Sequence, residues 1–246
     1  MKLFNQLLDS FSSKILCDLY SNINMAYQIP GFSPQTQLDI NMSQSKYQSF
    51  LKKMEGVAFP SLNEVSINSI PAHNRAVKYF LENSIPTSRI TWLSLQGDGL
   101  TDIGFYLTAI VKACERVTES IVFTNFQISE LQLKKVFMAC RHKERVLFYS
   151  CKFTFPRVPD FRRCLEGSKI WIMNFESCDL SSKSNWRSHP EEFENFVQGL
   201  ANSDLKKSLE TVDFGWCYGF GENYVPIIFS KYGLGHVQID GSFMGC

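Results

Sequence analysis

A short pattern that recurs along most of the chain constrains the fold more than any other feature. Eight copies begin at residues 35, 62, 90, 118, 143, 170, 209 and 234, so successive copies start 25 to 28 residues apart, with one interval of 39. Positions 4 and 6 of every copy are apolar. The position 4 residues are Leu38, Val65, Leu93, Ile121, Val146, Met173, Val212 and Val237. The position 6 residues are Ile40, Ile67, Leu95, Phe123, Phe148, Phe175, Phe214 and Ile239. Self-similarity at this period indicates stacked structural repeats.

The apolar residues two positions apart predict a short strand in each copy. Side chains alternate between the two faces of a strand, so positions 4 and 6 point to the same side, which we expect to be the interior. Position 9 follows the strand and is Cys151, Cys178 or Cys217 in three copies. We expect this residue to serve the buried backbone of neighbouring copies. One copy cannot bury its apolar face alone, so the copies must stack on one another.

The segments between the predicted strands carry a helical period. Apolar residues recur at i, i+3, i+4 and i+7 over 47–54, 103–114, 133–140, 193–200 and 225–232, which is typical of one-sided amphipathic helices. Capping boxes over 129–132 and 188–191 indicate where two of these helices begin. We therefore expect a helix in the return half of every copy, and an α/β fold with a parallel sheet.

This pattern resembles the leucine-rich repeat, L-x-x-L-x-L-x-x-N/C-x-L. The clearest copies run from Ile90 to Leu100, with Asp98 at position 9, and from Ile170 to Leu180, with Cys178 there. Repeats of this length with a full helix are similar to the ribonuclease-inhibitor type. The resemblance implies a horseshoe-shaped solenoid of about eight repeats over 35–246, with a parallel sheet on its concave face and helices on its convex face.

The two ends and one insertion depart from the repeat. Residues 1–34 are expected to form an N-terminal helical cap over the first copy. Only six residues follow the last predicted strand, which leaves an open sheet edge unless a partner, a second copy or a larger assembly covers it; a short self-capped end is the alternative. The interval of 39 residues contains an insertion around Trp186, which forms either a contact loop or a segment folded onto its own helix.

Composition and the reactive residues exclude several classes of protein. The net charge of +1 argues against a general nucleic-acid binder. No apolar run is long enough to predict a membrane-spanning helix, and the first residues do not resemble a secretory signal. The eight cysteines include no C-x-x-C pair, so we expect reduced, buried thiols in a cytosolic protein. The four histidines form neither a metal site nor a triad, so we expect no catalytic residue, metal, cofactor or enzymatic activity.

Positions 3, 5 and 7 of the copies are expected to face the open, concave side of the sheet. The middle of this face is apolar and aromatic, while five carboxylates, Asp39, Glu64, Glu176, Asp213 and Asp240, oppose a single Arg145. An apolar centre with a polar rim is typical of a protein-binding surface, although ordinary cross-strand packing is the alternative. The residues expected to contact a partner are Trp92, Val122, Leu147, Tyr149, Ile172, Glu176, Asp213, Trp186 and Trp216.

A basic group is expected on the opposite, helical side. It comprises Lys134, Lys135, Arg141, Lys143, Arg157, Arg162 and Arg163, which the repeat places on two neighbouring helices and their ends. Such a group forms either an ordinary solvated helix face or a contact for an acidic partner, such as a cytoskeletal polymer or RNA.

These observations predict a non-catalytic interaction or scaffold protein, a subunit of a larger assembly. It would bind a protein partner through the concave face or the open C-terminal edge, with no membrane or nucleic-acid partner. One alternative is a regulator of a small GTPase, because the Ran GTPase-activating proteins share this repeat type. Another is a ubiquitin-ligase substrate receptor, although the Leu-Pro start of an F-box is absent from the N-terminus. We expect a cytoplasmic location, with a cytoskeletal or ciliary assembly as one setting.

Overall fold

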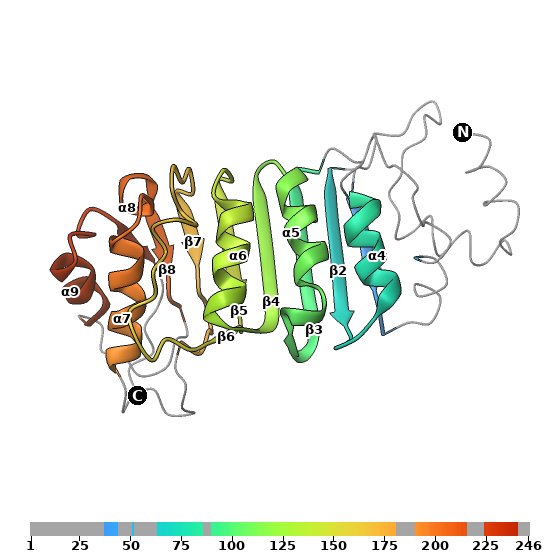
Figure 1. Ribbon diagram of the computed structural model, residues 1–246, viewed down its shortest axis with the longest axis horizontal. Helices are drawn as coiled ribbons and strands as arrows, with labels where there is room; N and C mark the ends of the chain where they lie inside the picture. The colour runs from blue at the N-terminus through green and yellow to red at the C-terminus, as the bar shows by residue number, and fades with distance from the viewer. Residues whose placement is uncertain are drawn as a thin grey trace, which may run out of the picture.

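The sheet runs through the whole described part of the chain in sequence order. The computed structural model describes residues 37–43, 51, 63–85, 90–180, 190–215 and 224–240. Every strand pair is parallel, and the order is β1-β2-β3-β4-β5-β7-β8-β9, with the short β6 paired to β4 beside β5 (Figure 1). The strands are β1 Gln37–Asn41, β2 Glu64–Ile70, β3 Trp92–Asp102, β4 Ser120–Ile128, β5 Arg145–Tyr149, β6 Lys152–Phe153, β7 Ile172–Asn174, β8 Thr211–Asp213 and β9 Gln238–Asp240.

The strand register confirms that the sequence copies lie beside one another, position by position. At position 4, each residue pairs with its equivalent in the next copy, in the order Val65, Leu93, Ile121, Val146 and Met173. At position 6, Leu95 pairs with Phe123 and Phe123 with Phe148. All of these side chains are fully buried. The recurring apolar pair therefore marks the strand face that forms the core.

The last copy is out of the predicted register by two residues. Val212 pairs with Ile239 instead of Val237, so Ile239 takes position 4. The reason is a turn before β9, in which Gly233 adopts a positive φ of 74° and the backbone N–H of Val237 donates to the carbonyl of Leu234. A shift of two residues keeps each side chain on the same face of the strand, so the alternation in the sequence does not reveal it.

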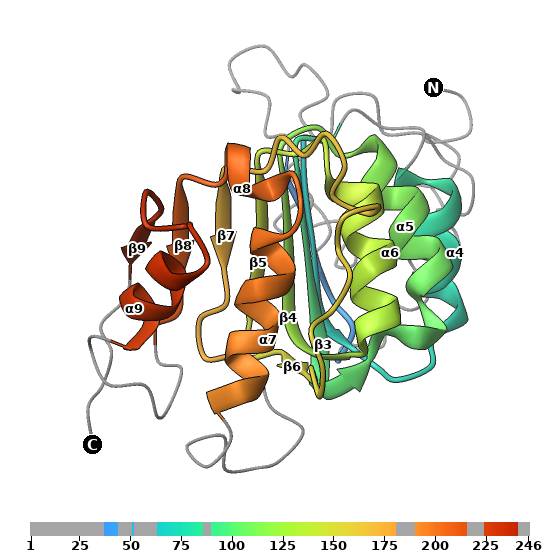
Figure 2. The same cartoon turned by 60° about the vertical axis from the view of Figure 1, so that its left-hand side comes forward.

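The helices lie along one face of the sheet (Figure 2). The predicted stripes over 103–114, 133–140, 193–200 and 225–232 are confirmed as helical faces that pack on the sheet. The capping box at Ser129 is also confirmed, because its backbone N–H donates to Gln132 Oε1 at 2.7 Å and its hydroxyl accepts from the Gln132 N–H at 3.4 Å. The helices are α4 Arg75–Asn83, the 3₁₀ helix η2 Ile103–Phe105, α5 Leu107–Arg116, α6 Glu130–Cys140, α7 Pro190–Ala201, α8 Leu205–Ser208 and α9 Tyr224–Lys231.

Several expectations fall outside the described residues. These are the N-terminal cap over 1–34, the second capping box at Ser188, the C-terminal edge beyond Asp240, and most of the stripe over 47–54. Within that stripe the structure describes Leu51, which is helical and buried.

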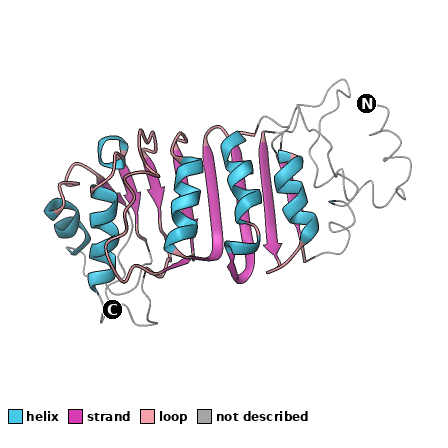
Figure 3. Ribbon diagram, viewed as in Figure 1, coloured by secondary structure: helices cyan, strands magenta, loops and turns pink. Residues whose placement is uncertain are grey.

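The prediction of a helix in every return segment is wrong for the copy that begins at Lys143. Residues 154–169 form turns and irregular backbone between β6 and β7 (Figure 3). Pro156 and Pro159 explain the difference, because proline lacks a backbone N–H and disfavours helical backbone in the residue before it. Arg157, Arg162 and Arg163 consequently lie in this loop and not on a helix.

Lys143, which we expected on the basic surface, is in fact buried. Its exposed fraction is 6%, and it occupies position 1, where four other copies carry Leu or Ile in the corrected register. Burial lowers the pKa of Lys143, and the neighbouring thiols of Cys140 and Cys114 partly oppose that shift. The described basic surface therefore excludes this residue.

Phenylalanine side chains form a continuous stack through the middle of the core. The rings of Phe123, Phe148, Phe175 and Phe214, all at position 6, follow one another at centroid distances of 5.3, 5.4 and 5.5 Å, with interplanar angles of 14° to 15°. Each ring is fully buried. Parallel rings at this separation are offset-stacked, which adds about 0.5–1.5 kcal/mol per pair to the burial of apolar surface.

The backbone bends at positions 8 and 9 with a geometry that recurs in four copies. Ser69, Asn125, Ser150 and Ser177, all at position 8, have positive φ between 50° and 59°. At position 9, the thiol of Cys151 donates to the carbonyl of Phe123 and that of Cys178 to the carbonyl of Phe148, both at 3.5 Å. This confirms the predicted role of position 9 in these two copies, since each cysteine serves the backbone of the preceding one.

The copy that begins at Ile90 breaks this turn. Asp98 and Leu100, predicted at positions 9 and 11, are exposed, and Thr101 takes the position 9 slot by pairing with Phe126. The chain makes its excursion at Gly97, where a Cβ atom would lie 2.6 Å from the Asn125 carbonyl oxygen. Only glycine fits such a close backbone approach.

Removing one ring from the stack is expected to destabilise the protein strongly. We expect Phe148→Ala to lower the free energy of unfolding by about 3–5 kcal/mol, because it leaves a cavity between Phe123 and Phe175. Leu131→Ala, which truncates a side chain that is 66% exposed, should change it by less than about 0.5 kcal/mol. Urea denaturation followed by circular dichroism measures both, and equal effects of the two substitutions would contradict the stack.

The positive φ at position 8 gives a second test. Ser150 is exposed and has φ of 50°, so its side chain contributes little besides backbone preference. We expect Ser150→Val to cost about 1–2 kcal/mol and Ser150→Gly to be neutral or stabilising by up to about 1 kcal/mol. The difference between the two variants in thermal unfolding isolates the backbone effect. A valine variant as stable as the glycine variant would show that this conformation is not required.

Candidate functional site

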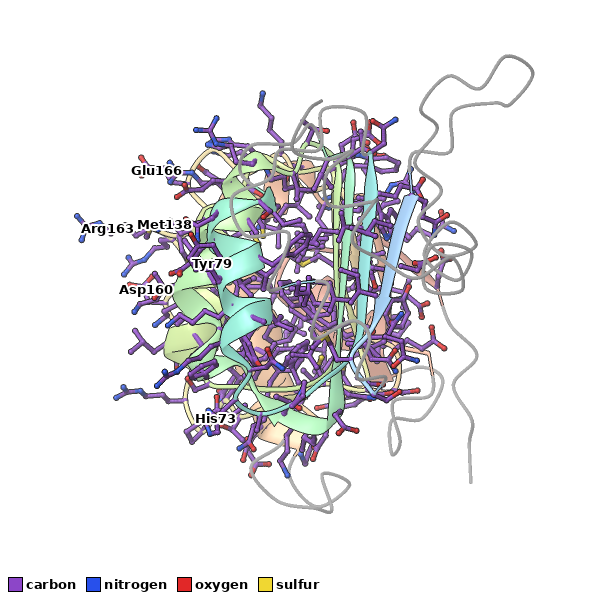
Figure 4. The ribbon with its side chains drawn as sticks, turned by 90° about the vertical axis from the view of Figure 1, so that its right-hand side faces the viewer. His73, Tyr79, Met138, Asp160, Arg163 and Glu166 are labelled. Atoms are coloured by element: carbon purple, nitrogen blue, oxygen red, sulfur yellow. The ribbon has the colours of Figure 1, made fainter. Side chains whose placement is uncertain are left out.

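The face of the sheet opposite the helices carries the predicted contact residues. Viewed along the sheet, the helices form a layer on one side of the strands, and none of the helices in the described ranges lies on the other side (Figure 4). We call this other side the open face and define it by positions 3, 5 and 7 of the strands. The register aligns its position 3 residues in the order Glu64, Trp92, Ser120, Arg145, Ile172 and Thr211.

The residues of the predicted apolar centre differ in how much of their surface is exposed. Val122 and Leu147 pair with each other at position 5, and only 5% and 8% of their surface is exposed, so they offer little surface to a partner. Trp92, Tyr149 and Ile172 are half-buried and present accessible surface. The reason for the difference at position 5 is that β4 and β5 each have a paired strand on both sides, whose neighbours enclose an aliphatic side chain.

The accessible apolar residues do not form one compact cluster. Trp92 and Ile172 are both at position 3, but they are separated by three strand-to-strand steps, β3 to β4 to β5 to β7. At about 4.8 Å per step, their backbones lie roughly 14 Å apart. Arg145 lies between them, and its guanidinium is 5.5 Å from the ring centroid of Trp171, a cation–π contact. Trp171 precedes the strand and was missed from the sequence, although it adjoins the predicted Ile172.

A network of hydrogen bonds orders the acidic residues at the C-terminal end of the open face. The Asn174 side-chain amide donates to Asp213 Oδ2 at 2.9 Å, and its oxygen accepts from the Glu176 N–H at 2.8 Å. The other oxygen of Asp213 accepts from the Gly215 N–H at 2.7 Å. Asn174 is buried, so the network holds the Asp213 carboxylate and the Glu176 backbone at fixed positions on neighbouring strands. We missed Asn174, although its place beside Glu176 was a usable signal.

These carboxylates act on Tyr149. Burial raises the pKa of the Tyr149 phenol, and the charges of Glu176 and Asp213 raise it further. The corrected register also places Asp240 directly beside Asp213. Negative charge therefore concentrates around an accessible aromatic ring on β5, β7, β8 and β9.

Trp186 and Trp216, the other two predicted contact residues, lie outside the described residues. Among the described cysteines, Cys114, Cys140, Cys151 and Cys164 are free and buried, and Cys178 is buried with its thiol donating to the carbonyl of Phe148. The described ranges contain no group of three or more metal-ligating side chains. Nor does any helix in the part of the chain that the structure describes have the length and apolar character needed to cross a membrane.

Comparison with known proteins adds no identity. The sequence matches no protein-family model, and no curated protein matches it.

Titration of Tyr149 tests whether the carboxylates converge on its hydroxyl. We expect the pKa of Tyr149 to lie above its ordinary value of 10.0. Glu176→Gln should bring the pKa of Tyr149 closer to 10.0, and the distant substitution Asp39→Asn should leave it unchanged. Because the folded pKa is the higher one, stability falls as pH rises from 10.0 through the folded pKa, and Tyr149→Phe removes that part of the fall. NMR of ¹³Cζ-labelled tyrosine, assigned with Tyr149→Phe, measures this. Equal shifts with both carboxylate variants would contradict the arrangement.

Proposed function

We propose that the chain is a leucine-rich repeat protein of the ribonuclease-inhibitor-like kind and acts without catalysis as an interaction or scaffold subunit. The in-order pairing of consecutive sequence copies supports this fold, as does the return of the chain through helices on one face of the sheet. Copies that each bury only one face must stack, which is the principle of a solenoid. The interruption at 154–169 and the excursion after Gly97 make the proposed repeats irregular.

The proposed activity is binding of a protein partner through the open face. The observation that carries it is the combination of half-buried Trp92, Tyr149 and Ile172 with the ordered carboxylate of Asp213 and the neighbouring Glu176 on a face without described helices. Aromatic anchors surrounded by polar groups account for most of the affinity at protein interfaces. The excess of carboxylates favours a partner with a basic surface and disfavours nucleic acid.

The proposed setting is a reducing compartment such as the cytoplasm, within a larger assembly. The support is the burial of the five described cysteines in the core, where they act as small apolar residues. In Cys151 and Cys178 the thiol hydrogen also serves a backbone carbonyl, which a disulfide would prevent.

A pair of tyrosine variants tests the binding face. Tyr149 lies on the open face and Tyr79, which is 39% exposed, lies on helix α4 on the other side of the sheet (Figure 4). We expect the native partner to be lost or weakened at least about tenfold with Tyr149→Ala, because loss of an anchor costs about 2 kcal/mol or more. Tyr79→Ala should leave it unchanged. Quantitative pull-down with mass spectrometry from the native source measures both, alongside the unfolding midpoint of each variant.

Two results would contradict this proposal. One is a partner whose recovery is insensitive to Tyr149→Ala and to Trp92→Ala while both variants remain folded. The other is a partner lost with Tyr79→Ala alone, which would move the interface to the helical side.

A further inference from the structure

The helix layer is interrupted between α6 and α7 (Figures 1 and 3). Residues 154–169, which we call the proline loop, replace the helix there. A cavity of about 440 Å³, which we call the hollow, opens to solvent beside the loop and the end of α7. Its lining residues are Val158, Pro159, Asp160, Arg162 and Asn202. Val158 is 38% exposed, so the hollow presents apolar surface to solvent.

The proline loop is held in place by buried side chains. Phe155 stacks on Phe196 of α7 at 4.8 Å, and Phe161 packs edge-to-face against Phe137 of α6 at 5.2 Å. Both loop rings are fully buried. The loop therefore fills the core space that a helix would occupy, and its outer surface is preformed.

Backbone contacts fix the same loop at both of its ends. The Phe155 N–H donates to the Glu192 carboxylate at 3.3 Å, and the Asn195 side-chain amide donates to the Phe155 carbonyl at 3.2 Å. At the other end, the Lys169 N–H donates to the Arg141 carbonyl at 2.7 Å. Gly199 on α7 allows Pro159 to approach, since a Cβ atom there would lie 2.6 Å from Pro159 Cγ.

The proline loop and the adjoining end of α6 carry positive charge that no described carboxylate pairs. Arg162 is neutralised by a two-pronged pair with Asp160, with both N···O distances at 2.9 Å. Within the described part of the chain, by contrast, no carboxylate pairs with the basic rim, which we define as Arg141, Arg157, Arg163 and Lys169. The exposed Glu166 is the one acidic residue of the loop besides Asp160.

The electrostatics of His142 agree with this distribution. His142 follows Arg141, is exposed, and accepts a hydrogen bond from the Arg141 Nε at 3.2 Å. Its pKa is lowered by desolvation and then by the charges of Arg141, Lys169 and Lys143. No acidic residue offsets these three charges at His142, as expected where cations converge.

We propose that the proline loop is a second interface, which binds an acidic polypeptide segment of a partner protein. An aliphatic side chain of that segment enters the hollow against Val158 and Pro159, while its carboxylates pair with Arg157, Arg163 and Arg141. The Asp160 carboxylate at the hollow is paired with Arg162. The Asp204 carboxylate, which accepts from the Gly167 N–H of the loop, is paired with Lys207. Glu166 is the acidic residue of the loop left to oppose the four cations of the rim, so charge complementarity selects an acidic occupant. A nucleic acid fits less well, since the loop buries both of its described aromatic rings and offers no exposed one for base stacking.

This second interface lies on the helical side, away from the open face, so the two surfaces are independent (Figure 4). Arg163, Asp160 and Glu166 project from the helical side in that view, beyond the helix layer. One chain could then hold two partners of opposite charge at once, which is the arrangement a scaffold requires.

The test uses fluorescent peptides and the intact chain. The probe is a short peptide of Asp and Glu with one central Leu. The control probes are the same peptide with Ser in place of Leu, a Lys-rich peptide and a single-stranded RNA. Fluorescence anisotropy at about 50 mM and about 300 mM salt measures binding. We expect the acidic Leu peptide to bind most tightly, to weaken with salt, and to weaken again when Ser replaces Leu.

Paired charge reversals locate the binding. We expect Arg157→Glu/Arg163→Glu to weaken binding of the acidic peptide at least about tenfold. The control Lys112→Glu/Arg116→Glu changes two exposed cations of α5 on the same side and should have no effect. All four positions are exposed, so both variants should unfold at the wild-type denaturant concentration.

Three outcomes would overturn the proposal. The first is absence of binding of the acidic peptide at low salt. The second is an equal effect of the loop variant and the α5 variant, which would indicate non-specific attraction. The third is tighter binding of RNA than of the acidic peptide, lost in the loop variant, which would assign the loop to nucleic acid. Each result is independent of the open face, because none of the substitutions lies there.

Discussion

The structure depends on one constraint, the parallel pairing of identical positions in successive sequence copies. Position 4 pairs with position 4 and position 6 with position 6, so like residues form rows that run across the strands. The row at position 6 becomes the stack of Phe123, Phe148, Phe175 and Phe214. A flat ring can repeat along such a row at the strand spacing of about 4.8 Å with a small offset, so phenylalanine is a natural choice for consecutive copies.

A bend at positions 8 and 9 accompanies that register in four of the copies. A left-handed residue at position 8 changes the direction of the chain, and the residue at position 9 enters the core immediately afterwards. Cysteine suits position 9 because it is small and apolar and its thiol still satisfies a carbonyl of the previous copy. Serine and asparagine at position 8 accept the left-handed conformation at a cost that glycine would avoid. The same local geometry is thus repeated with different residues.

The sequence predicted the strands, their inward faces and four of the helical stripes. Burial on one face places apolar residues at the period of the strand or helix, and this period can be read directly from the sequence. It did not predict the register of β9, since a shift of two residues preserves alternation. The exposed Leu100 and the buried Thr101 invert the expected pattern within β3, because the register of that strand shifts between Gln96 and Thr101. The close backbone approach at Gly97, where this shift begins, is not visible in the apolar pattern. The missing helix at 154–169 was predictable, since Pro156 and Pro159 both oppose a helix.

For the open face, the sequence predicted which side each residue occupies but not how accessible it is. Val122 and Leu147 lie on the predicted side and are nevertheless buried, while Trp92, Tyr149 and Ile172 remain half-buried. Accessibility depends on the size of neighbours on two other strands, which are distant in sequence. The fixed position of the Asp213 carboxylate likewise depends on Asn174, whose side-chain amide on β7 donates to it across to β8.

The interruption in the helix layer shows that the sheet and the helices carry separable constraints. The strands must keep their register, because each contributes a ring to the core stack, and β5 and β7 pair without a helix between them. What the core requires of the return segment is apolar volume, which Phe155 and Phe161 supply from a loop. Once those two rings satisfy the core, the outer surface of the loop is free to differ from that of a helix. It carries the basic rim and the hollow, while the opposite face concentrates carboxylates around Tyr149. A chain with a net charge of +1 thus carries two oppositely charged surfaces, which the sheet separates.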